Sequence, residues 1–198
     1  MLRSERNKLE LDGWVLEPID SKDSYGILKS FDCGDSDLNE YFNEQALPNK
    51  AALIGRPYFL YDSTVYDSTA GIKIPLALID LCNDAVRKAS GKKTPGYQEV
   101  VEIEPEKQYP FLPAVKITRF GVSVEFRRNN IGSHTLNMIK QLFVTENRTG
   151  CRLLTVDAYN KPEVLSFYQK NDFQFFYERD ADKPQRAMFY DLQRLIIG

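Results

Sequence analysis

The sequence predicts a single α/β domain built on a mixed β-sheet. Two observations carry this prediction: a strand that ends in a short polar turn and leads into an amphipathic helix (residues 113–143), and a later strand, helix and strand (residues 152–173). A strand, turn and helix followed by another strand is typical of a sheet with helices packed on its faces. The chain has 198 residues, of which 42% are hydrophobic and 27% charged, enough for one sizeable core. We therefore expect one domain over residues 1–198.

The first elements are a strand and a helix. Trp14–Ile19 is rich in strand-forming residues, and Ser36–Ala52 has apolar residues on one face, so we expect a helix there that breaks at Pro48. Ser36 or Asp35 can cap its first turn by accepting hydrogen bonds from backbone N–H groups. The apolar face of this helix is formed by Leu38, Tyr41 and Phe42.

Further strands are expected in the middle of the chain. Arg56–Tyr61 and Ile72–Cys82 are rich in aliphatic, aromatic and β-branched residues. Asn83–Gly96 is charged and interrupted by glycine and proline, which predicts a short helix running into a loop, and Tyr97–Tyr109 leads back to the core. Pro113–Val124 then supplies the central strand.

The turn after the central strand is a candidate phosphate site. The first N–H groups of a helix have no partner within the helix and lie at the positive end of its dipole, so they can bind a pyrophosphate. Gly132 permits close approach of a ligand, and Arg127 and Arg128 add positive charge. The following helix is expected to face the core with Ile131, Met138, Ile139, Leu142 and Phe143.

Together with the segment that begins at Arg152, this turn resembles the GNAT acetyltransferase superfamily. The pyrophosphate motif of that family appears as Arg127-x-x-Asn130-x-Gly132, and a later helical motif appears as Phe167-Tyr168-Gln169-Lys170-Asn171-Asp172-Phe173. Asn130 and Asp172 stand where the family usually has glycine. Asparagine and aspartate tolerate left-handed backbone better than other residues with side chains, so both turns remain available.

An earlier segment is similar to a toxin-like subgroup of the same family. Phe31-Asp32-Cys33-Gly34 and the following residues to Tyr41 match its Phe-x-Cys-Gly motif, with a leucine and an aromatic residue at the later positions. In the family this part of the chain helps to line the side of the site where the acceptor substrate binds.

The resemblance implies a GNAT-like fold and a set of cofactor contacts. The fold is a mixed, mostly antiparallel sheet, splayed between two adjacent parallel strands, with helices on both faces. The cosubstrate is acetyl-CoA, and no metal is expected. Its pantetheine arm would bond to the backbone of Phe120, Gly121 and Val122, with a bulge at Gly121, and Asn160 would bond the arm or instead cap the next helix. The pyrophosphate would lie on Arg127, Arg128, Asn130, Ile131, Gly132 and Ser133.

The resemblance also assigns a catalytic residue. Tyr168 would protonate the departing thiolate, a contribution of about 10²- to 10⁴-fold for general acid catalysis; the alternative is one more aromatic side chain in the core. The base is not assigned: Asp80, Glu102 and Glu104 are nominated only by approximate location. His134 is expected to face solvent in the first turns of its helix.

The leading hypothesis is an N-acetyltransferase that moves acetyl to a primary amine by direct attack in a ternary complex. Neither Cys82 nor Cys151 is expected to carry an intermediate, because neither has a histidine partner. One alternative is toxin-like acetylation of aminoacyl-tRNA, which the net charge of −2 disfavours. Another is a non-catalytic acyl-CoA-binding module.

The acceptor is expected to be an amine-bearing small molecule or a peptide, and an aminoacyl-tRNA is the less favoured choice. A homodimer is kept open. The chain has no apolar run of membrane-spanning length and no signal-like segment, so we expect a cytoplasmic protein without a membrane partner. Three cysteines, odd in number and widely spaced, fit reduced thiols.

Overall fold

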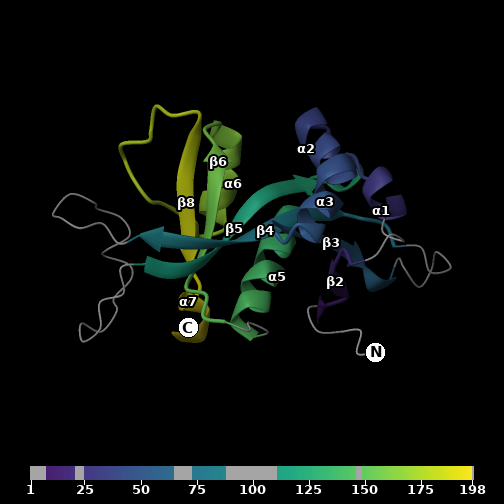
Figure 1. Cartoon of the computed structure of the whole chain (residues 1–198), viewed down its shortest axis with the longest axis horizontal. Coiled ribbons are helices and arrows are strands. Elements are labelled where there is room, and N and C mark those ends of the chain that lie inside the picture. Colours follow the sequence, from purple (N-terminus) through teal and green to yellow (C-terminus); the bar gives the residue numbers. More distant parts are fainter. Residues whose placement is uncertain (1–7, 21–24, 65–72, 88–110, 146–148, 198) are drawn as a thin grey trace. The chain divides into compact units, whose positions relative to one another are not determined.

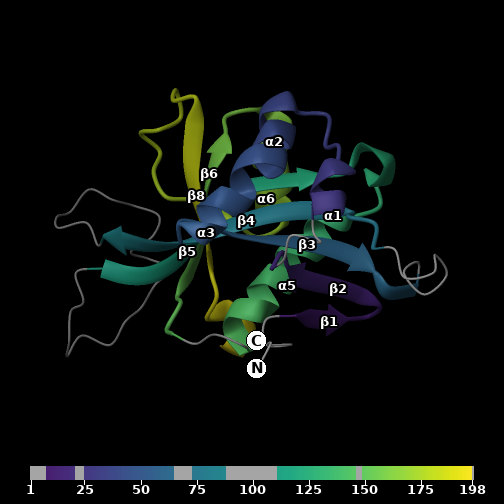
Figure 2. The same ribbon diagram turned by 45° about the vertical axis from the view of Figure 1, so that its right-hand side comes forward.

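The protein is described from a computed structural model that covers residues 8–20, 25–64, 73–87, 111–145 and 149–197 (Figures 1 and 2). Its strands join in one sheet in the order β1-β2-β3-β4-β5-β6-β8-β7. Neighbouring strands pair antiparallel at β1–β2, β2–β3, β3–β4, β6–β8 and β7–β8, and β5 and β6 pair in parallel. The mixed, mostly antiparallel sheet with one parallel pair is therefore confirmed. Its strands are β1 (Leu9–Leu11), β2 (Trp14–Pro18), β3 (Arg56–Asp62), β4 (Ala77–Arg87), β5 (Phe111–Val122), β6 (Leu153–Tyr159), β7 (Gln174–Phe175) and β8 (Gln185–Asp191).

The chain divides into two compact units. The first contains residues 1–82 and 118–146, and the second contains residues 83–117 and 147–198. The helical elements of the first unit are α1 (Tyr25–Lys29), α2 (Ser36–Glu40), the π-helical turn η2 (Tyr41–Gln45), α3 (Ala46–Ala51), the 3-10 turn η3 (Val124–Phe126) and α5 (Ile131–Thr145). Those of the second unit are α6 (Pro162–Lys170) and α7 (Arg194–Ile197).

The first unit contains a hairpin, β1 and β2, that was not predicted. Asp12 and Gly13 both have positive φ, of 52° and 82°, as two-residue turns between antiparallel strands require. This turn joins β1 to β2, which starts at the predicted residue Trp14. The Asp-Gly pair was the signal for the extra strand.

The predicted helix over residues 36–52 is present, but the predicted break at Pro48 is wrong. Asp35 caps its start, because its side chain accepts hydrogen bonds from the N–H groups of Asp37 and Leu38. The irregularity comes earlier, in η2, where the Ala46 N–H bonds the carbonyl of Tyr41 five residues back. Pro48 then lies in the first turn of α3, where a missing N–H costs little.

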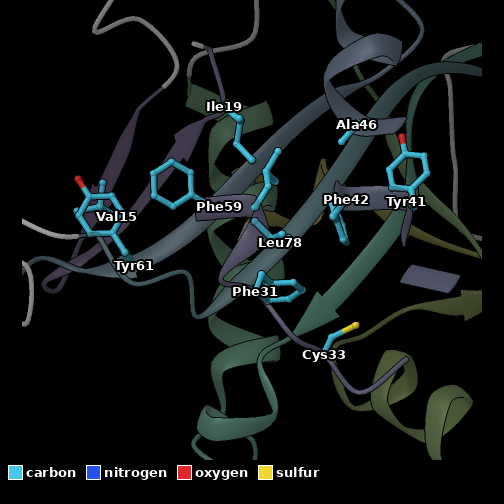
Figure 3. Close-up of a cluster of buried hydrophobic side chains, with 11 residues drawn as sticks. Val15, Ile19, Phe31, Cys33, Tyr41, Phe42, Ala46, Phe59, Tyr61 and Leu78 are labelled. Carbon is cyan, nitrogen blue, oxygen red and sulfur yellow. The ribbon is translucent and has the colours of Figure 1, made fainter. Parts of the chain in front are cut away.

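Helices cover both faces of the strands in the first unit. Because side chains alternate along a strand, Val15 of β2 faces one way and Trp14 the other. Figure 3 shows the cluster on the Val15 side, where aromatic and aliphatic side chains of β2, β3 and β4 pack against η2 and α3. The helix α5 contacts β1 and β2, with Trp14 stacked on His134 at a ring-centroid distance of 5.2 Å.

The strand β4 differs from the prediction at both ends. It begins at Ala77 and runs to Arg87, so the predicted helix over Asn83–Gly96 is wrong over residues 83–87. Alternating burial along Asn83–Arg87 shows the reason: the residues of this stretch alternate between exposed and half-buried positions along a strand. Residues 88–110, with the expected return segment and the nominated Glu102 and Glu104, lie outside the described residues.

The second unit contains the parallel pair. Residues Ala114–Ile117 of β5 pair with Leu153–Val156 of β6, and the register ends there although β6 continues to Tyr159. On its other side β6 pairs along its whole length with β8, and β8 pairs with the short strand β7. The helix α6 contacts β6 (Figure 1). The predicted strand, helix and strand after Arg152 are thus confirmed.

Candidate functional site

The loop between β5 and α5 has the backbone of an anion nest. Arg128 and Asn130 have positive φ, of 69° and 57°, on either side of Asn129. Alternation of left-handed residues turns successive N–H groups toward one point. The first helical hydrogen bond of α5 runs from the His134 N–H to the Asn130 carbonyl at 2.9 Å, so the N–H groups of the preceding residues lie in the unbonded first turn. Asn130 therefore has the left-handed conformation that asparagine tolerates.

Side chains around this loop divide into core and surface. Ile131 is buried, so only its backbone can serve a ligand, and Gly132 and Ser133 are half-buried. Arg128 is exposed at the loop. His134 is exposed as expected and stacks on Trp14, which gives it a packing role.

Arg127 makes a contact within the protein that was not predicted. Its guanidinium donates a hydrogen bond to the main-chain carbonyl of Cys33, in the turn Asp32–Asp35, which we call the Cys-Gly turn. The Val124 N–H donates to the carbonyl of Asp32 at 2.9 Å. The Cys-Gly turn is thereby joined to both ends of η3, immediately before the anion nest.

The Cys-Gly turn also lies against the end of β5. A Cβ atom at Gly121 would lie 3.0 Å from the Cβ and 3.1 Å from the sulfur of Cys33. The missing side chain at Gly121 therefore makes room for the turn, in addition to the bulge that the resemblance implies there. Phe120 and Val122, on either side, are half-buried, and with Gly121 they remain candidate contacts of a cofactor arm.

Hydrogen bonds within the Cys-Gly turn fix its conformation. One carboxylate oxygen of Asp32 accepts from the Gly34 N–H and from the Asn39 side-chain amide, both at 2.7 Å. The bond from Gly34 and then that from Asn39 lower the pKa of Asp32. The Asn39 oxygen accepts from the N–H of Cys33 at 3.0 Å and from its thiol at 3.1 Å.

In the second unit Tyr168 lies on α6 and is buried, in edge-on contact with Phe167 and Phe173 at 5.1 and 5.3 Å. Burial raises the pKa of its phenol above the ordinary value of 10.0, so the group stays protonated at neutral pH. This is the form that a proton donor requires. Asp172 ends the helix in the left-handed conformation, with φ of 64°, as predicted for that position.

Asn160 does not cap α6. The N-cap position is Lys161, without a side-chain hydrogen bond. The side-chain nitrogen of Asn160 donates to the carbonyls of Ala181 at 2.7 Å and Lys183 at 2.8 Å, and so holds the segment before β8. Contact with a cofactor arm would use its remaining oxygen or its backbone carbonyl.

Neither Cys33 nor Cys151 is an activated thiol. Burial raises the pKa of Cys151 to about 11 and also raises the pKa of Cys33, so both stay protonated. Among the described residues there is no group of three or more His, Cys, Asp or Glu side chains that could hold a metal ion. None of the described helices is long and apolar enough to cross a membrane.

A buried polar cluster lies in the first unit. It joins Asp80, a base nominated only by location, to Tyr41 and Thr118, which the sequence analysis did not connect with it. Sequence spacing gave no signal for this contact because Tyr41 and Asp80 are 39 residues apart.

Comparisons with known proteins establish the fold. No protein-family model matches the chain, and no curated protein matches it in sequence. Solved structures do match: AtaTR bound with acetyl-CoA, at 19% identity and a TM-score of 0.65, covers 94% of this chain and 98% of its own. A tyrosine-to-phenylalanine variant of KacT gives 17% identity and a TM-score of 0.71 over 94% and 99% of the two chains.

A third structure, AtaT complexed with acetyl-methionyl-tRNAfMet, is 18% identical with a TM-score of 0.66, covering 93% of this chain and 98% of that one. All three matches extend over almost the whole length of both chains. The chain therefore has the GNAT fold that its two motifs implied.

Proposed function

We propose that this chain is an acetyl-CoA-dependent N-acetyltransferase, with direct attack of an amine on the thioester in a ternary complex. The observation that carries the proposal is the anion nest at Arg128–Asn130 before α5, in a chain with the GNAT fold. The similar structure of AtaTR was determined with acetyl-CoA bound. In this chain the nest would hold the pyrophosphate of the cosubstrate through backbone N–H groups, with Arg128 adding charge.

The reaction needs a proton donor for the thiolate and no covalent enzyme intermediate. Tyr168, buried and protonated, fits the donor. The protonated thiols of Cys33 and Cys151 favour direct transfer over an acyl-enzyme. No step requires a metal.

The acceptor is best supported as the α-amino group of an aminoacyl-tRNA. Two observations favour it over other primary amines: the similar protein AtaT was solved with acetyl-methionyl-tRNAfMet, and the Cys-Gly turn here belongs to a motif typical of the toxin-like subgroup. Other amine-bearing small molecules and peptides remain the wider class of acceptor. A non-catalytic acyl-CoA-binding module is the outcome if binding occurs without transfer.

Binding of CoA tests the cofactor. A ligand that binds only the folded chain raises its melting temperature by mass action. We expect CoA and acetyl-CoA to raise the melting temperature of the wild type, and Gly132→Glu to remove the shift by placing bulk and negative charge in the nest. Gly26→Glu is the matched control, because a side chain at Gly26 meets nothing within 4 Å. No shift at millimolar CoA, together with no heat of binding, contradicts the proposal.

Acetyl transfer tests the acceptor. Radiolabelled acetyl-CoA is incubated with a total aminoacyl-tRNA pool, a peptide with a free amino terminus and a polyamine, while release of the CoA thiol is followed. We expect the label to enter the aminoacyl-tRNA fraction and to leave the tRNA when the ester bond is cleaved by mild base. Label in the peptide or polyamine alone would show that the acceptor is another amine. CoA binding without transfer would show that the chain is a non-catalytic acyl-CoA-binding module.

A further inference from the structure

The first unit contains a carboxyl group in an unusual position. Asp80 lies on β4 with only 1% of its surface exposed. Its Oδ2 accepts hydrogen bonds from the Tyr41 phenol and the Thr118 hydroxyl, both at 2.7 Å. Its Oδ1 is buried and accepts no hydrogen bond of normal geometry among the described residues, although the neighbouring Leu81 N–H lowers the pKa of the carboxyl group. A buried carboxylate with one oxygen unsatisfied costs stability and needs an explanation.

The backbone makes room for this carboxyl group. A Cβ atom at Gly55 would lie 2.5 Å from Oδ2 and 2.9 Å from Oδ1 of Asp80. A larger residue at position 55 would therefore displace the carboxyl group from this position. The site is built by two strands and a helical turn: Asp80 comes from β4, Thr118 from β5 and Tyr41 from η2.

Tyr41, which donates a hydrogen bond to Asp80, lies at the edge of the buried cluster. Figure 3 shows Tyr41 at the edge of the buried cluster, with its hydroxyl directed away from Phe42. The side-chain amide of Asn49 reaches the same hydroxyl at 3.4 Å, and the guanidinium of Arg119 lies 4.7 Å from the ring centroid. Tyr41 is also the first residue of the π-helical turn, a feature that often occurs at functional sites.

The charges around Asp80 suit a proton acceptor. Burial raises its pKa above the ordinary value of 3.8. The hydrogen bonds from Tyr41 and Thr118, the charge of Arg119 and the backbone N–H of Leu81 oppose this and lower it. Burial likewise raises the pKa of Tyr41 to about 12, so the phenol is protonated and donates to Asp80. A base with a raised pKa holds a proton better than an ordinary carboxylate does.

The strand β5 brings this cluster close along the chain to the predicted cofactor contacts. Thr118 precedes Phe120, the first residue assigned to the pantetheine arm, by two positions on the same strand. Successive residues on one side of a strand are about 7 Å apart, so a pantetheine arm bonded to Phe120 would lie about 7 Å along the strand from Thr118, which bonds Asp80.

On this basis, and resting on the proposed function, we propose that Asp80 and Tyr41 form a proton relay that deprotonates the acceptor amine. The amine nitrogen forms its bond to the thioester carbon and gives a proton to the Tyr41 oxygen, whose own proton moves to Asp80. The carbon–sulfur bond breaks with its electron pair on sulfur, and that thiolate takes up a proton from the general acid of the reaction. Thr118 acts as a positioning residue for the carboxylate.

Kinetics of Asp80→Asn test the relay. The rate is measured between pH 6 and 8 with whichever of the three amines above the wild type acetylates fastest. We expect kcat/KM to fall by about 10²- to 10⁴-fold, while the CoA-induced thermal shift is unchanged. Asp84→Asn is the matched control: Asp84 lies on the same strand, and it accepts a threonine hydroxyl at 2.8 Å. It should keep the wild-type rate.

Two further variants separate the relay from a structural role. Tyr41→Phe should lose activity to a similar extent, and the double variant should lose no more than the worse single one, because the two groups act as a unit. Tyr61→Phe is its control, since Tyr61 is also buried and donates to a carboxylate, Glu17, at 3.2 Å.

The pH dependence of the rate distinguishes the relay from a role in packing, because a loss of packing would not shift it along the pH axis. Protonation of Asp80 blocks the relay, so the wild-type rate should decline as the pH falls through a pKa above the ordinary aspartate value. Thr118→Val removes a hydrogen bond that favours the carboxylate, so the decline should move to higher pH. Protonation of the free amine affects every variant equally and cancels in the ratio of their rates.

The possible results test the relay separately from the proposed function. Loss of activity in Asp80→Asn and Tyr41→Phe with intact CoA binding, and a shifted profile in Thr118→Val, support the relay. Wild-type rates in Asp80→Asn, or fully additive losses in the double variant, overturn it while the proposed function stands. A wild-type protein that binds CoA and transfers acetyl to none of the amines overturns the proposed function itself.

Discussion

Arg127 donates a hydrogen bond to the main-chain carbonyl of Cys33, although 94 residues separate them in the sequence. The bond joins the loop that carries the anion nest to the Cys-Gly turn. Close packing reinforces it, because Cys33 fills the space left by the missing side chain of Gly121. The pyrophosphate motif and the earlier Phe-x-Cys-Gly motif are therefore parts of one structure in the first unit.

Gly34→Ala should damage this junction. Gly34 has φ of 71°, and a Cβ atom there would lie 2.9 Å from Val124 Cγ1 and 3.2 Å from Arg127 Nη2. Left-handed backbone costs a residue with a side chain about 1–3 kcal/mol, and the steric overlap adds to that. We expect a lower melting temperature and weaker binding of CoA, measured by thermal scanning and calorimetry.

The control for Gly34→Ala is Gly26→Ala. Gly26 lies in α1 and a side chain there meets nothing within 4 Å, so alanine should be neutral or slightly stabilising. Unchanged CoA affinity in a folded Gly34→Ala protein would show that the Cys-Gly turn does not fix the conformation of the loop that carries the anion nest.

The conformation of Asn130 gives a second prediction. Because Asn130 is left-handed, Asn130→Gly should preserve the nest and bind CoA at least as well as the wild type. Asn130→Val introduces a β-branched residue that strongly disfavours positive φ, so CoA affinity should fall about tenfold or more. Calorimetric titration of both variants with CoA decides the point, and equal affinities would contradict the nest geometry.

Tyr168→Phe separates proton donation from packing. The change removes only the phenol oxygen, so the aromatic contacts with Phe167 and Phe173 persist. If Tyr168 protonates the thiolate, kcat should fall by about 10- to 1000-fold while CoA binding is nearly intact. Tyr177→Phe, a half-buried tyrosine of the same unit, serves as the control. An unchanged kcat would assign thiolate protonation to water.

The same substitution has a stability signature at high pH. The folded pKa of Tyr168 is raised above its unfolded value of 10.0, so above pH 10 the unfolded chain binds fewer protons at this residue than the folded one. The free energy of unfolding therefore declines as pH rises above 10, and Tyr168→Phe should show a shallower decline. Chemical denaturation at pH 9 and above measures the difference.

Asp80→Asn should be no less stable than the wild type at pH 7. The folded pKa of Asp80 lies above 3.8, so the folded chain binds more protons than the unfolded one once the pH exceeds that value. The wild type thus loses stability as the pH rises through the folded pKa, and an uncharged amide escapes this loss. Melting curves from pH 4 to 7 should show the relative stability of Asp80→Asn growing with pH.

A stabilised and inactive Asp80→Asn protein would mean that the buried charge is retained for chemistry at a cost in stability. A variant that is much less stable at every pH would instead show that the carboxylate is needed for packing. The Asp84→Asn control, in which the carboxylate is only half-buried, should show neither effect.

The sequence alone determined the local elements with strong periodic or turn signals. The amphipathic pattern after Asn130 predicted α5, and residues that tolerate positive φ predicted left-handed turns at Asn130 and Asp172. These features depend on backbone sterics and side-chain spacing within a few residues, so they can be recognised without the rest of the fold. Residues 83–87 were misread as helical because charge patterns do not distinguish an exposed helix from a half-exposed strand.

Only the tertiary structure decided which residues share a site. Arg127 was predicted from its position in the loop to hold phosphate, and only the fold shows that its guanidinium also donates to the carbonyl of Cys33. Asp80 was nominated only by approximate location, and only the fold shows its carboxyl group against Gly55 and its bond with Tyr41. Such contacts arise when strands and helices distant in sequence pack together, and desolvation, which raises the pKa of Asp80, exists only in the packed state.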